Sequence, residues 1–72
     1  MDGTIRDVKA RHEQYLLSLP GVVSVGIGRG NDGREEIVVG LDRPRPRTSR
    51  RIPATLEGYP VRSDVRGRMR AL

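Results

Sequence analysis

The fold is decided by a valine- and glycine-rich stretch near the middle of the chain, which reads Pro20-Gly21-Val22-Val23-Ser24-Val25-Gly26-Ile27-Gly28. Successive side chains of a strand point to opposite faces. Val23, Val25 and Ile27 therefore share one apolar face of a predicted strand over residues 22–28. The small residues between them share the opposite face, which we expect to be nearly bare.

A second stretch repeats this alternation, because Ile37, Val39 and Leu41 fall on one side of the run that contains them. The residues at positions 29–33 include two glycines, an Asn and an Asp, which tolerate the positive φ of a tight connection. Residues 22–41 are thus predicted to form a β-hairpin. The glycines also spell a dinucleotide-binding fingerprint, but that motif needs a helix after it, and a strand is predicted here.

An amphipathic helix is predicted ahead of the hairpin, over residues 5–19. Its apolar stripe recurs at steps of three and four and consists of Ile5, Val8, His12, Tyr15, Leu16 and Leu19. Thr4 and Asp7 have the spacing of a capping box, and Pro20 disfavours helical geometry at the residue before it. We expect the stripe to pack on the Val23 side of the hairpin and to form the core.

The second half of the chain holds three further predicted features. Residues 43–51 contain five arginines and two prolines, which predicts an extended, mobile loop. Residues 53–58 begin with Pro and end with Gly, which is typical of a short helical turn. Residues 59–65 alternate as a third strand, whose Pro60 favours an edge position or the start of the strand.

The predicted fold class is α+β. Residues 1–72 form a single small domain, a two-layer sandwich of order α-β-β-(short α)-β in which the helix packs on a small antiparallel or mixed sheet. A domain of this size buries only about 60% of the surface that its unfolded chain exposes. A second copy or a partner chain would therefore help it.

Composition excludes several kinds of site. The chain has no Cys and one His, which excludes disulfides, thiolate metal sites and imidazole clusters. His12 has no nucleophile or orienting partner at helical spacing, and the acidic residues Asp32, Glu35 and Glu36 lack the spacing of a calcium loop. We predict no catalytic residue, no metal and no cofactor, and hence no enzyme.

Hydropathy bears on localisation. No run approaches the roughly 18 apolar residues of a membrane span. The first residues, Met1-Asp2-Gly3-Thr4, lack a basic and apolar leader. The sequence therefore predicts a cytoplasmic protein with no membrane partner.

Positive charge gathers in the second half of the chain. The net charge is +5, and residues 42–72 carry nine Arg against three acidic residues. Because Arg suits bidentate phosphate contacts, one hypothesis is electrostatic nucleic-acid binding through Arg43, Arg45, Arg47, Arg50 and Arg51. Only two Tyr are present, so no stacking platform for bases is predicted. A solvated basic loop is the simpler interpretation.

The stretch at residues 19–28, with a helix ahead of it, resembles a small α+β module associated with bacterial proteins of the trypsin-like peptidase class. Residues 37–41, 52–58 and 64–72 are similar to the module's second strand, its "I-P-x-x-x-x-G" turn and its closing segment. The catalytic residues of that class lie in a peptidase domain, so none carries over. The resemblance implies a propeptide-like or inhibitor module.

A looser likeness joins residues 19–25 to the ferredoxin-like fold of heavy-metal-associated domains, which also runs a helix into a strand at a Gly-Val step. The Cys pair that binds metal in those domains is missing. This likeness implies a fold and no metal function.

The leading functional prediction is a non-catalytic protein-binding or accessory module. A strand face with few side chains allows another backbone to approach closely. We expect binding through an exposed edge strand and through the face that bears Ser24, Gly26, Gly28, Val38 and Gly40. The partner would be another protein or a second copy of the chain, and nucleic acid is the alternative partner.

Overall fold

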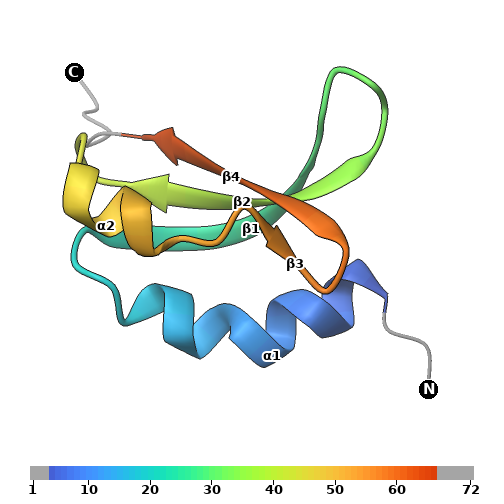
Figure 1. The fold of residues 1–72 in the computed structure, drawn as a ribbon, viewed down its shortest axis with the longest axis horizontal. Coiled ribbons are helices and arrows are strands. Elements are labelled where there is room, and N and C mark those ends of the chain that lie inside the picture. The colour runs from blue at the N-terminus through green and yellow to red at the C-terminus, as the bar shows by residue number, and fades with distance from the viewer. Residues whose placement is uncertain (1–3, 67–72) are drawn as a thin grey trace, which may run out of the picture.

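The computed structural model describes residues 4–66, and Figure 1 shows its helices and strands in two layers. In chain order these are α1 (Ile5–Leu17), β1 (Val22–Arg29), β2 (Glu35–Leu41), α2 (Pro46–Arg51), β3 (Thr55–Leu56) and β4 (Tyr59–Val65). The predicted α+β fold, with a helix packed on a small sheet, is confirmed. The closing segment of the resemblance falls mostly outside the described residues.

The sheet is mixed and has the strand order β1-β2-β4-β3. β1 and β2 pair antiparallel, which confirms the hairpin, and β3 pairs antiparallel with β4. The predicted third strand is β4. It returns parallel to β2, in a register that runs from Ile37↔Val61 to Leu41↔Val65. β2 therefore lies in the interior of the sheet, with a strand on either side.

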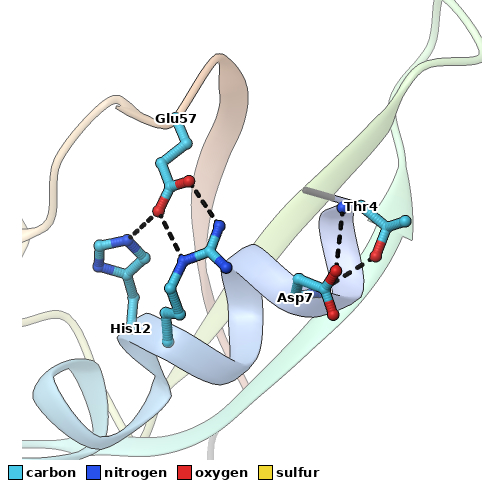
Figure 2. Close-up of polar contacts among 5 residues, drawn as sticks. Thr4, Asp7, His12 and Glu57 are labelled. Atoms are coloured by element: carbon cyan, nitrogen blue, oxygen red, sulfur yellow. Dashed lines mark hydrogen bonds and ion pairs between the residues drawn. The ribbon is translucent and has the colours of Figure 1, made fainter. Parts of the chain in front are cut away.

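α1 begins where the sequence predicts. Thr4 Oγ1 accepts a hydrogen bond from the Asp7 N–H at 3.2 Å, and the Thr4 N–H donates to Asp7 Oδ2 at 3.4 Å. The capping box is drawn in Figure 2. Such a box satisfies two backbone donors that the first helical turn leaves free.

α1 lies along one face of the sheet (Figure 1), and the core is formed between them. It is formed by side chains that are at most 5% exposed, namely Ile5, Val8, Leu16, Leu19, Ile37, Val39 and Leu41. Tyr15, predicted to be in the core, is instead 52% exposed. Leu16 takes the inward position, and its neighbour Tyr15 lies about 100° around the helix from it.

The predicted core face of β1 is only partly correct. The register shifts between Val22 and Ser24, so that Val22 packs against the core and Val23 is 55% exposed. An extra residue in one strand reverses its alternation from that point. Val25 packs on the core as predicted, whereas Ile27 remains 39% exposed.

The short helix lies earlier than predicted. Residues 46–51, expected to belong to an extended loop, form α2, with Pro46 at its start. The buried Thr48 hydroxyl donates to the Pro20 carbonyl at 2.7 Å and fastens α2 to the loop before β1. Residues 53–58, expected to be helical, instead contain β3 and a turn in which Glu57 and Gly58 have φ values of 50° and 91°.

Candidate functional site

β1 forms one edge of the sheet. Within residues 4–66 its strand neighbour is β2 alone. Its first seven residues carry no charge, and its last is Arg29. Natural edge strands are usually shielded by charges, by Pro, by bulges or by a covering element. β1 has a bulge at one end but otherwise keeps an uncharged run with exposed Val23 and Ile27.

The backbone of β1 directs hydrogen-bonding groups to this open side. The Gly30 N–H donates to the Arg34 carbonyl at 2.9 Å, which makes these two residues a hydrogen-bonded pair at the end of the hairpin. Bonded and non-bonded pairs alternate along an antiparallel ladder. Gly28 is then bonded to β2, while the N–H and C=O groups of Val25 and Ile27 point away from the sheet.

The opposite edge is built differently. β4 pairs with β3 only at Tyr59 and Pro60. Beyond them it carries Arg62 and Asp64, and Asp64 Oδ2 lies 3.9 Å from both the Arg62 and the Arg66 guanidinium groups. A proline and alternating charges are the usual protection of an edge strand. The two long edges of the sheet thus differ in their chemistry.

The sheet face turned away from α1 is open at one glycine. A Cβ at Gly26 would meet no atom within 4 Å. A Cβ at Gly28 would lie 3.0 Å from Val38 Cγ2, and one at Gly40 would overlap the Ser24 hydroxyl. The bare face predicted along the whole strand is therefore bare only at Gly26.

Side chains from β4 cover much of this face. Arg62 Nε donates to Glu36 Oε2 at 2.6 Å, and Glu36 is only 8% exposed. Val38 and Gly40 are buried as well. Of the five residues predicted to contact a protein partner, the three on β1 keep access to solvent and the two on β2 are covered.

A second feature is a groove of about 650 Å³ beside α2. We call it the arginine groove, and it is lined by Pro20, Arg43, Pro44, Arg45, Pro46, Arg47, Thr48 and Arg50. It gathers four of the five arginines of the nucleic-acid hypothesis. Arg51, at the end of α2, does not line it. Sequence reasoning found these arginines but placed them on a loop.

A third feature joins α1 to the turn between β3 and β4 (Figure 2). Glu57 Oε1 accepts a hydrogen bond from Arg11 Nη2 at 2.6 Å, and Glu57 Oε2 lies 2.9 Å from His12 Nε2. Hydrogen bonds from Arg11 and then from His12 lower the Glu57 pKa to about 2. This partner for His12 could not be predicted from local spacing, because Glu57 lies 45 residues away.

These contacts fasten the turn between β3 and β4 to α1. Among residues 4–66 there is no group of three or more acidic or His residues that could hold a metal ion. The helices of the same part of the chain are all too short and too polar to cross a membrane.

Comparison of the chain with protein-family models, with curated proteins and with solved structures finds no match. The resemblances to a peptidase-associated module and to heavy-metal-associated domains therefore stay predictions.

Proposed function

We propose that this chain is a non-catalytic protein-binding module that pairs its β1 edge with an extended strand of another chain. The observation that carries the proposal is the open side of β1, an eight-residue strand that is uncharged up to Arg29. Main-chain hydrogen bonds supply the affinity in this kind of recognition, and alternate side chains supply the specificity.

A second copy of the chain is the partner that the β1 sequence fits. An antiparallel pair of β1 strands related by a twofold axis at Gly26 places Val25 of each copy opposite Ile27 of the other. The outward N–H and C=O groups of these residues then bond to each other. No two like charges come opposite one another, and the exposed Ile27 gains apolar cover.

The residues on the sheet face turned away from α1 are also compatible with this dimer. At the axis the two Gly26 residues face each other without side chains, so no side chains clash there on the sheet face turned away from α1. Ser24 and Gly28 flank it and are also small. The result is one continuous sheet across two copies, with α1 of each copy on the same side.

The test uses Ile27→Pro. Proline removes an N–H that points away from β2, so the hairpin keeps its own ladder while the open edge loses a donor. We expect the wild-type chain to show a concentration-dependent dimer in sedimentation velocity and the variant to stay monomeric with an unchanged helix signal in circular dichroism. A wild-type chain that is monomeric at every concentration would overturn the proposal.

Gly26→Glu provides a second, independent variant. Its side chain enters open space in the single copy, so the fold should persist, but two carboxylates would meet at the axis of the dimer. Glu35→Lys is the matched control, because Glu35 is exposed at the far end of β2. Dimers that survive Gly26→Glu but not Glu35→Lys would contradict pairing through β1.

A further inference from the structure

The arginine groove carries positive charge that is not neutralised by ion pairs within the fold. Its lining contains four arginines and no carboxylate. Arg45 is already neutralised, since its Nε and Nη2 donate to the two oxygens of Asp42 at 2.8 and 2.9 Å. Arg43, Arg47 and Arg50 have no ion-pair partner within the described residues. One wall of the molecule therefore presents three guanidinium groups outside any ion pair, of which Arg43 lies near enough to the Asp42 carboxylate to help lower its pKa.

The frame that holds these groups is built from specific contacts. The Thr48 hydroxyl is bonded to the Pro20 carbonyl, which fixes α2 beside the start of β1. The Arg45 guanidinium lies against Gly21, where a Cβ would overlap it and where φ is +84°. The groove is thus present before any ligand arrives, and binding costs little reorganisation of the backbone.

The arginines are spread along the groove. Arg47 and Arg50 are three residues apart on α2, so their side chains leave the helix as neighbours, about 5–6 Å apart at Cβ. Arg43 lies ahead of α2 in the segment that follows β2. A groove of about 650 Å³ with charges in a row suits a ligand that carries several anionic groups in series better than a single small anion.

We propose that the arginine groove binds the phosphodiester backbone of nucleic acid, without sequence selectivity. Arginine forks match phosphate oxygens bidentately, and a cleft of one sign of charge concentrates the field on a polyanion. The apolar part of the lining is Pro20, Pro44 and Pro46, which is not the aromatic and long aliphatic set that inserts into a lipid surface. The site is separate from β1 and does not depend on the proposed dimer.

The experiment measures binding of a short labelled DNA duplex to the full chain by fluorescence anisotropy over a series of salt concentrations. With three phosphates neutralised, the log–log salt slope should be about −2.7, which weakens binding by roughly 40-fold for a fourfold rise in salt. Arg47→Gln/Arg50→Gln should reduce the slope to about −1 and weaken binding at low salt by at least about tenfold.

The matched control is Arg6→Gln/Arg34→Gln. It removes the same net charge from two exposed arginines that do not line the groove. If the control weakens binding as much as the groove variant does, the whole-molecule charge and not the groove is responsible, and the proposal fails. The Ile27→Pro chain should bind DNA with an unchanged slope, so failure of the β1 proposal is seen separately.

Two competitors identify the ligand class. Poly-glutamate at equal charge should displace the duplex poorly, and inorganic phosphate should displace it only through its ionic strength. Displacement by poly-glutamate as effective as by unlabelled duplex would assign the groove to acidic protein segments. Displacement by inorganic phosphate beyond a matched chloride control would assign it to a small anion. Either result overturns the nucleic-acid proposal.

Discussion

β1 and β2 are the two strands of one hairpin and are both rich in Val, Ile and Gly, yet six of the seven residues of β2 are buried and none of the eight of β1 is. The difference comes from the rest of the chain. β4 returns parallel to β2 and satisfies its second side, while the described residues leave the second side of β1 open. Strands that are buried on both faces tend to be nearly continuous in apolar residues, and the last six residues of β2 are all buried.

The comparison shows that strand composition alone does not place a strand in a sheet. β4 carries the Pro and alternating charges that natural edges use, whereas β1 has the composition of an interior strand at an edge. The simplest physical reason for such a strand is that it becomes interior when a partner strand arrives. The following experiments test how far the two strands differ.

The largest difference in stability is expected when an isoleucine is truncated to alanine on each of the two strands. Ile37→Ala removes a side chain with no exposure and should lower the free energy of unfolding by about 2–5 kcal/mol. Ile27→Ala, on a side chain that is 39% exposed, should lower it by only about 1 kcal/mol. Urea denaturation at a concentration that keeps the chain monomeric measures both.

In the proposed dimer the difference between the costs of the two variants should narrow. Ile27 becomes covered by the second copy, so at high protein concentration the cost of Ile27→Ala should grow while that of Ile37→Ala stays constant. An Ile27→Ala cost that is independent of concentration would show that β1 stays open.

Glycine substitutions give the next largest effect. A Cβ at Gly40 would overlap the Ser24 hydroxyl and come within 3.1 Å of Arg66 Cγ, so Gly40→Ala should cost about 1–3 kcal/mol. A Cβ at Gly26 meets open space, so Gly26→Ala should be neutral or stabilise by up to about 1 kcal/mol. Thermal unfolding of the two variants, monitored by circular dichroism, provides the comparison.

A second substitution tests whether the contact with Ser24 causes the loss of stability in Gly40→Ala. Ser24→Gly added to Gly40→Ala removes the side chain that the new methyl group would meet, and most of the lost stability should return. If the double variant is no more stable than Gly40→Ala alone, the cost lies with Arg66 or with the backbone of β2 and not with the contact across the hairpin.

The periodic elements could be predicted from sequence. Alternation identified the hairpin and β4, and the three-four spacing with Thr4 and Asp7 located α1. The pairing of β4 with β2 could not be predicted, because the strand pattern does not record which neighbour a strand takes. The exposure of Val23 follows from a one-residue bulge, which reverses the alternation without a change in composition.

The candidate sites could be predicted from the sequence only in part. The arginines of the groove were found by their charge, but α2 was missed because its anchor is a single bond from Thr48 to a backbone carbonyl across the structure. Val38 was counted as surface because the reach of Arg62 over the sheet cannot be seen in a strand pattern. Contacts between distant parts of the chain carry this information, and local periodicity does not.

The smallest effect concerns the Glu57 cluster, which holds the β3–β4 turn on α1 and so helps to keep β4 beside β2. Because Arg11 and His12 lower the Glu57 pKa from 4.5 to about 2, the ionised carboxylate stabilises the folded chain at pH values above 4.5. That contribution is lost as the pH falls from 4.5 to about 2. Glu57→Gln should therefore lower stability at neutral pH, with a difference from wild type that vanishes in acid.

Urea midpoints of wild type and Glu57→Gln across this pH range measure the difference. The cluster is exposed, so added salt should also shrink it at neutral pH. Glu35→Gln is the control, because Glu35 makes no ion pair among the described residues and should leave the pH profile unchanged. If Glu57→Gln differs from wild type equally at every pH, the carboxylate charge does not hold the turn. The pairing between β2 and β4 would then hold β4 in place without the Glu57 cluster. This pairing alone would leave β1 at the edge of the sheet.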